Sequence, residues 1–91
     1  MEIRWTDEAL DRLAEIRDYL EIRNPKAAQS VAERLIDAAD SLEHLPYRGK
    51  KTAHGTFRLI IPAYRYRFIL EYIITDKTAS IVYVWRAEQM K

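Results

Sequence analysis

The lysines and arginines of this chain are the residues best suited by type and spacing to bind a ligand, and most of them lie in its second half. Arginine suits phosphate and carboxylate ligands because its planar guanidinium donates two parallel hydrogen bonds. We predict that the basic residues of this half form a binding surface for an anionic partner. The predicted set is Arg58, Arg65, Arg67, Arg86, Lys50 and Lys51. Taken singly, each also has a structural explanation, since exposed strands carry arginine for solubility and edge protection.

Net charge is divided unevenly along the chain. Residues 1–45 hold six Lys and Arg against eleven Asp and Glu, whereas residues 46–91 hold nine against three. The first part therefore carries a net charge of −5 and the second +6, which together give the overall +1. Such asymmetry suggests that one face suits an anionic partner, either nucleic acid or an acidic protein segment.

Three tyrosines near the arginines offer a second kind of contact. Tyr47, Tyr64 and Tyr66 have the side chain that stacks on the bases of single-stranded nucleic acid. A half-buried strand residue is the structural alternative. It suits Tyr66 better, because period-two alternation places it on one face with Phe68 and Leu70.

Proton transfer at neutral pH has one candidate, His54, since the unperturbed pKa of histidine lies near neutrality. A lone loop histidine is nevertheless more often a residue without a catalytic role. The other histidine, His44, lies ten residues away, which is not the spacing of a metal-binding pair. There is no cysteine, no glycine-rich phosphate loop and no serine in a Gly-x-Ser-x-Gly turn. We therefore expect no metal or nucleotide cofactor.

The sequence predicts two helices before these basic residues. After a short strand over Glu2–Trp5, Thr6 is suited to cap a helix whose apolar residues recur at three- and four-residue steps. Asn24 and Pro25 then favour the start of a second helix, and Pro46 disfavours its continuation. The two predicted buried stripes are Ala9, Leu13, Ile16 and Leu20, and Ala28, Val31, Ala32, Leu35, Ala39 and Leu42.

Strands follow the helices. A polar loop over 47–55 leads into a strand over 57–61, and Pro62-Ala63 is predicted to turn the chain back. Alternation over 64–74 predicts a central strand, the hairpin tip falls at Asp76-Lys77, and the last strand covers 80–86 before a polar tail over 87–91. The fold class is thus α+β in the order β-α-α-β-β-β, with a helical hairpin packed on an antiparallel sheet.

Length and composition limit the organisation of the chain. Ninety-one residues, 48% of them hydrophobic, suffice for a single domain over residues 1–91. No apolar run approaches the roughly 20 residues that span a bilayer. The first five residues lack the apolar stretch of a signal peptide, and no disulfide is possible without cysteine. We expect a cytoplasmic protein that does not associate with membranes.

Several short motifs resemble the ParE/RelE superfamily of toxins and occur in that family's order. They are Trp5–Leu10 (WTDEAL), Asn24–Ala28 (NPKAA), Leu42–Pro46 (LEHLP), Gly55–Ile61 (GTFRLII), Tyr66–Leu70 (YRFIL) and Val84–Arg86 (VWR). The resemblance covers nearly the whole chain. The element order deduced above agrees with the family's fold.

The resemblance implies the toxin of a type II toxin–antitoxin pair, bound by a helical or extended segment of a cognate antitoxin. ParE-like members inhibit DNA gyrase, whereas RelE-like members cut mRNA in the ribosomal A site without a metal. The long helical hairpin and the Asn24–Ala28 start favour the ParE-like branch. Arg86 stands where many relatives have histidine and Leu70 where tyrosine is frequent, which weakens a catalytic assignment.

Three functional hypotheses remain open from the sequence. The favoured one is a gyrase inhibitor neutralised by its antitoxin. The alternative is a ribosome-dependent mRNA endonuclease, in which Arg58, Arg67 and Arg86 hold phosphate charge and His54 moves a proton. The third is a binding module without toxicity.

Overall fold

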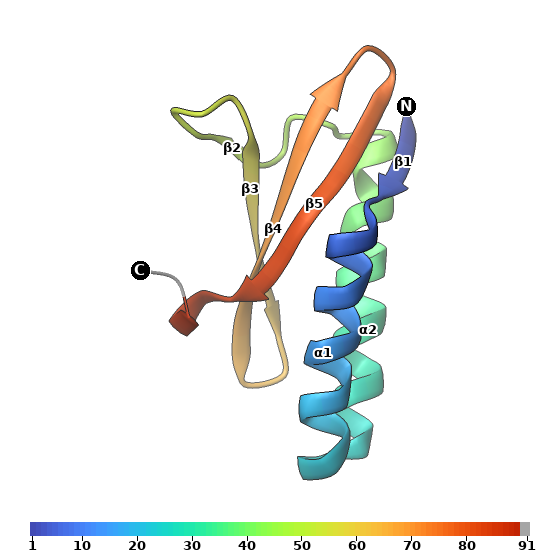
Figure 1. The fold of residues 1–91 in the computed structure, drawn as a ribbon, viewed down its shortest axis with the longest axis vertical. Coiled ribbons are helices and arrows are strands. Elements are labelled where there is room, and N and C mark those ends of the chain that lie inside the picture. The colour runs from blue at the N-terminus through green and yellow to red at the C-terminus, as the bar shows by residue number, and fades with distance from the viewer. Residues whose placement is uncertain (90–91) are drawn as a thin grey trace.

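Two layers, a helical hairpin and a five-stranded sheet, make up the part of the chain that the computed structural model describes, residues 1–89 (Figure 1). The elements are β1 (Glu2–Trp5), α1 (Asp7–Arg23), α2 (Pro25–Asp40), the 3₁₀ turn η1 (Ser41–Glu43), β2 (Lys50–Lys51), β3 (Phe57–Ala63), β4 (Tyr66–Thr75), β5 (Thr78–Arg86) and the 3₁₀ turn η2 (Ala87–Gln89). The predicted α+β order is confirmed, with the two-residue β2 added to it.

Both helices begin at the predicted caps. The Thr6 hydroxyl accepts a hydrogen bond from the Ala9 amide at 3.2 Å and donates to the Ile81 carbonyl at 3.0 Å, so it also joins α1 to the sheet. The Asn24 side chain accepts from the Ala27 amide at 3.2 Å, directly before Pro25 opens α2. Among residues 1–89, no helix is long and apolar enough to cross a membrane.

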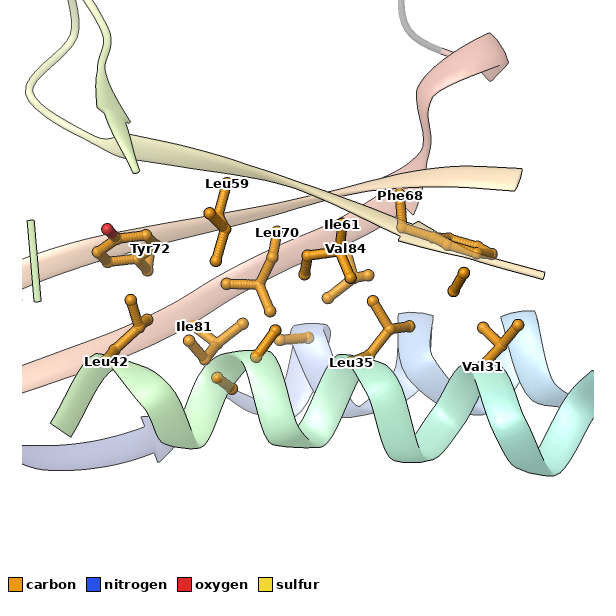
Figure 2. Packing of buried hydrophobic residues seen from close by; sticks show 14 of the residues in the cluster. Val31, Leu35, Leu42, Leu59, Ile61, Phe68, Leu70, Tyr72, Ile81 and Val84 are labelled. Carbon is orange, nitrogen blue, oxygen red and sulfur yellow. The ribbon is translucent and has the colours of Figure 1, made fainter. Parts of the chain in front are cut away.

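The sheet has the strand order β1-β5-β4-β3-β2. The predicted antiparallel pairing is confirmed for β3, β4 and β5, and the added β2 also pairs antiparallel, with β3. β1 is the exception and lies parallel to β5. Residues 2–5 thus pair with residues 78–81, at the far end of the chain. Both helices cover one face of the sheet and leave the other without a helix (Figures 1 and 2).

The turn after β3 is shifted from its predicted place. Pro62 and Ala63 belong to β3, and the turn falls at Tyr64 and Arg65, where Tyr64 has a positive φ of 56°. Pro62 fits in the strand because its backbone nitrogen and carbonyl point away from β4, so no ladder hydrogen bond is lost; the carbonyl instead accepts two hydrogen bonds from Arg34 at 2.6 and 3.2 Å. The loop predicted over 47–55 also contains a short strand, β2.

The core fills the space between the helices and the sheet (Figure 2). Most of the two predicted helical stripes is fully buried, and Leu13, Ile16 and Ala32 are half-buried. The predicted inner face of β4 is confirmed, with Phe68, Leu70 and Tyr72 at 0% exposure.

The last strand departs from simple alternation. A β-bulge opposite Glu71 and Tyr72 leaves Val82 without a ladder partner, since Glu71 pairs with Tyr83 and Tyr72 with Ile81. Ile81 and Val84 therefore both face the core, although they lie three residues apart. The predicted polar tail over 87–91 begins with η2, and its last two residues lie outside the described part of the chain.

Candidate functional site

The uncovered face of the sheet carries two of the predicted arginines. Arg58 on β3 and Arg67 on β4 alternate with core residues of their strands, so both side chains stand on the face opposite the helices. Arg67 is exposed and pairs in the ladder with Pro62. We call this side of the sheet the open face.

Arg58 is held by two contacts on the open face. Its Nε lies 3.5 Å from Oε2 of Glu71, an ion pair without a hydrogen bond from that nitrogen, and its guanidinium lies 5.4 Å from the centre of the Trp85 ring. Its side chain is 36% exposed. The Arg58 guanidinium therefore already has two partners within the protein, the Glu71 carboxylate and the Trp85 ring.

Glu71 organises the loop beside Arg58. Its carboxylate accepts a hydrogen bond from Thr56 at 2.6 Å, and the Thr56 and Thr52 hydroxyls are 2.8 Å apart. The His54 amide donates to the Thr52 hydroxyl at 3.2 Å, so the network reaches the exposed His54. Sequence reasoning missed the role of Glu71. The available signal was that it is the only acidic residue between positions 46 and 75.

The remaining basic residues lie in different places. Arg65 is in the β3–β4 turn and not on a strand, with its guanidinium 5.5 Å from the centre of the Tyr64 ring. Lys50 and Lys51 are exposed on β2 at the edge of the sheet.

Arg86 lies on the helix side of the sheet. It is opposite Phe68 in the β4–β5 ladder, and its guanidinium lies 4.9 Å from the centre of the Tyr19 ring and 5.5 Å from that of Tyr66. Its Nε is 3.8 Å from Glu88. It borders a cavity of about 200 Å³ against α1, lined also by Arg12, Glu15, Ile16 and Leu20.

The four residues named for RNA cleavage are consequently not brought together. Arg58 and Arg67 are on the open face, and Arg86 is on the other. Phe57, where β3 begins, lies opposite Tyr72, whereas Arg86 lies opposite Phe68, four residues along β4. At ~3.3 Å per residue the two positions are about 13 Å apart along the strand. His54 precedes Phe57 and so lies near the end of the sheet away from Arg86.

A buried tyrosine fixes the segment that carries the lysines. The Tyr72 hydroxyl donates to the Pro46 carbonyl at 2.8 Å and accepts from the Gly49 amide at 2.9 Å. Burial raises the pKa of Tyr72, while the Gly49 hydrogen bond and the charge of Arg48 act in the opposite direction. A Cβ at Gly49 would lie 2.7 Å from this hydroxyl, so the position requires glycine. We call these two hydrogen bonds the Tyr72 latch.

The fold and these side chains define a small two-layer α+β domain with basic residues on both sides of its sheet. Within residues 1–89, no group of three or more His, Asp or Glu side chains is arranged to hold a metal ion.

The chain belongs to the ParE toxin family of type II toxin–antitoxin systems. The family model described as "ParE toxin of type II toxin-antitoxin system, parDE" matches residues 3–90. The predicted membership in the ParE/RelE superfamily is therefore confirmed.

Named relatives and a solved structure agree with this membership. "Toxin RelE2" of Caulobacter vibrioides is 37% identical over 91 residues, covering 98% of each chain. "Putative toxin Y4kP" of Sinorhizobium fredii is 36% identical over 87 residues, covering 96% of this chain and 88% of the relative. A structure titled "Chromosomal ParDE TA system from P. aeruginosa" superposes with a TM-score of 0.78 at 20% identity, covering 94% of this chain and 95% of the other. The fold is thus the same as in that protein.

Proposed function

We propose that this toxin acts in the cytoplasm by inhibiting DNA gyrase and is neutralised by a cognate antitoxin. The observation that supports gyrase over RNA as the target is the separation of the candidate catalytic residues. RNA cleavage without a metal needs cationic groups and a proton-transfer group around one phosphate. Here Arg86 is on one face of the sheet, Arg58 and Arg67 are on the other, and His54 is near the opposite end.

A basic surface without an acid–base pair is sufficient for a protein that binds its target. Arg67 is exposed on the open face, and Lys50 and Lys51 extend positive charge to the sheet edge. Opposite charges across an interface accelerate association and select the partner. We assign target binding to this group, with Arg65 at the adjacent turn.

An antitoxin accounts for the apolar residues that the described chain leaves exposed. Large hydrophobic side chains in contact with solvent mark interaction sites when they gather on a surface. Leu45 and Tyr47, which line one surface hollow before β2, are 59% and 68% exposed. The superposed structure is titled as a ParDE toxin–antitoxin system, which supports a partner of the same kind here.

The alternative, a ribosome-dependent mRNA endonuclease, is favoured by one structural observation and one relative. Arg58 and Arg67 share the open face, as two phosphate contacts would require, and the relative from C. vibrioides is named RelE2. A second experiment must therefore separate the two targets.

Gyrase supercoiling of relaxed plasmid DNA is the direct test. The wild-type chain should inhibit supercoiling, and Arg67→Glu should reduce inhibition at least tenfold, because it reverses an exposed charge on the open face. Arg17→Glu is the matched control. It makes the same charge change on the exposed side of α1, where Arg17 is 56% exposed, and should inhibit like wild type.

Mapping of transcript ends on translating ribosomes completes the test. New ends made by the wild-type chain, together with unaffected supercoiling, would replace the gyrase assignment with the nuclease. Inhibition by a folded Arg67→Glu variant at wild-type strength would remove Arg67 from the target surface.

A further inference from the structure

Arginine and tyrosine side chains alternate at one end of the molecule, where the α1–α2 connection and the β3–β4 turn lie (Figure 1). The two segments are joined by a hydrogen bond of 3.0 Å from the Asn24 side-chain amide to the Tyr64 hydroxyl. In the order of their contacts, the alternating residues are Arg23, Tyr19, Arg86, Tyr66, Tyr64 and Arg65. We call this group the arginine–tyrosine end.

Tyr19 is the aromatic residue that α1 supplies to this group. Two guanidiniums lie against its ring, that of Arg23 at 3.7 Å and that of Arg86 at 4.9 Å from the ring centre. Arg23 also donates a hydrogen bond of 2.7 Å to the Tyr19 carbonyl. An arginine held by such contacts loses less side-chain entropy when it binds a phosphate. These contacts therefore position Arg23 before a ligand arrives.

Arg86 connects α1 to the tyrosines of the β3–β4 hairpin. Its guanidinium lies 5.5 Å from the centre of the Tyr66 ring, which in turn lies 6.2 Å from the centre of the Tyr64 ring. The Arg65 guanidinium follows, 5.5 Å from the Tyr64 ring. Glu88 brings one carboxylate to the group, 3.8 Å from Arg86 Nε. The three arginines leave an excess of positive charge, which favours an anionic ligand.

Tyr64 has a backbone conformation that suits other residue types better. It is the first residue of a two-residue turn between Ala63 and Tyr66, and its φ is 56°. Glycine and asparagine adopt a positive φ at lower cost than an aromatic residue. The ring is 52% exposed, so little burial compensates for this cost. Strained residues cluster at binding sites, and Tyr64 presents an exposed ring to a ligand.

Single-stranded nucleic acid matches this combination of charge and exposed rings. Its phosphates suit guanidinium groups, and its unpaired bases stack on aromatic side chains, whereas the bases of a duplex are stacked on one another. An acidic peptide would satisfy the arginines, but its carboxylate side chains have no ring to stack on Tyr64. Arg67 follows Tyr66 on β4 and lies on the open face, so the arginine–tyrosine end borders the surface assigned to gyrase.

We propose that the arginine–tyrosine end binds single-stranded DNA, with phosphates on Arg23 and Arg65 and a base stacked on Tyr64. This contact is additional to the one assigned to the gyrase protein. The choice of DNA over RNA rests on the proposed function, because gyrase acts on DNA. The choice of a nucleic acid rests on the side chains alone.

Fluorescence anisotropy of a labelled oligothymidine of about twelve nucleotides measures this binding with the full chain. Tyr64→Asn should weaken binding about tenfold, the loss expected for one stacked base. Tyr64→Phe is the matched control, because it keeps the ring and should bind within about twofold of wild type.

Urea denaturation separates this effect from a loss of the fold. Asparagine suits the positive φ at position 64, so Tyr64→Asn should unfold at the same urea concentration as wild type or at a higher one. Lower stability of Tyr64→Asn together with wild-type affinity for oligothymidine would assign the ring to the turn alone and overturn its role in binding.

Salt dependence measures the phosphate contacts. Loss of one phosphate-binding cation lowers the slope of log Kd against the logarithm of salt concentration by about 0.7 for single-stranded DNA. Arg23→Gln should show this decrease and bind about threefold more weakly. Arg17→Gln is the matched control, since Arg17 is a 56% exposed arginine of α1 outside the arginine–tyrosine end, and it should keep the wild-type slope.

Four further outcomes would overturn the inference. Equal slopes for Arg23→Gln and Arg17→Gln, or equal affinities of Tyr64→Asn and Tyr64→Phe, would remove these side chains from a nucleic-acid site. Poly-glutamate bound as tightly as oligothymidine would identify an acidic protein segment as the ligand.

Oligouridine bound at least as tightly as oligothymidine would replace DNA by RNA and support the nuclease alternative. No binding of either oligonucleotide to the wild-type chain would refute this contact alone, because inhibition of gyrase supercoiling is measured separately and decides the proposed function.

Discussion

Replacing Tyr72 by phenylalanine should loosen the basic edge of the sheet without disturbing the core. The ring, at 0% exposure and stacked on Phe57 with centroids 5.3 Å apart, stays in place. The variant loses only the Tyr72 latch, that is, the hydrogen bonds to the Pro46 carbonyl and from the Gly49 amide. Residues 46–49 then lose their attachment immediately before Lys50 and Lys51.

The size of the effect follows from the two hydrogen bonds. Each is worth about 1 kcal/mol net, and the half-buried Gly49 N–H is left without its acceptor, so the free energy of unfolding should fall by roughly 2 kcal/mol. For a domain of this length, that corresponds to a decrease in Tm of roughly 8–16 °C.

Urea denaturation followed by circular dichroism measures the change, with Tyr47→Phe as the control. Tyr47 is 68% exposed and its ring contact with Phe57 survives the substitution, so its cost should stay within about 0.5 kcal/mol. If Tyr72→Phe is no less stable than Tyr47→Phe, then the latch does not stabilise the fold and this reasoning is refuted.

Two further predictions concern stability. Asn24→Ala removes the cap of α2 and the hydrogen bond to the Tyr64 hydroxyl at 3.0 Å, and should lower the free energy of unfolding by about 1 kcal/mol; a change below about 0.3 kcal/mol in urea denaturation would contradict the capping role. The raised pKa of Tyr72 means that the folded state keeps this hydroxyl protonated at pH values where the unfolded chain loses its proton. Its contribution is therefore complete below the ordinary pKa of 10.0 and is lost as pH rises above it, so wild type should lose stability relative to Tyr72→Phe between pH 9 and pH 11, and parallel curves for the two proteins would show that the shift is absent.

Capping and periodicity explain why the helices and the inner face of the sheet were predictable. Thr6 and Asn24 bond to amides three residues away, so the caps depend on neighbours in the sequence. The alternation along β4 is likewise local, and its buried residues Phe68, Leu70 and Tyr72 are those that the pattern indicated.

The candidate site was predicted less completely, because strand geometry redistributed its arginines. Arg58 and Arg67 share the open face, whereas Arg65 belongs to a turn and Arg86 packs between Tyr19 and Tyr66 on the helix side. The sequence thus indicated which residues are basic, but not on which face of the sheet each one lies. Their division between the two faces depends on the ladder pairing, which joins residues far apart in the sequence.

The sequence by itself determined the element order, the caps, the buried stripes and the family of this protein, since each follows from neighbouring residues or from motifs in order. Only the tertiary structure decided that β1 lies parallel to β5 and that Tyr72 holds Pro46 and Gly49. The physical reason is that these features are contacts between segments 23 or more residues apart, whose register is set by packing of the whole sheet against the helices.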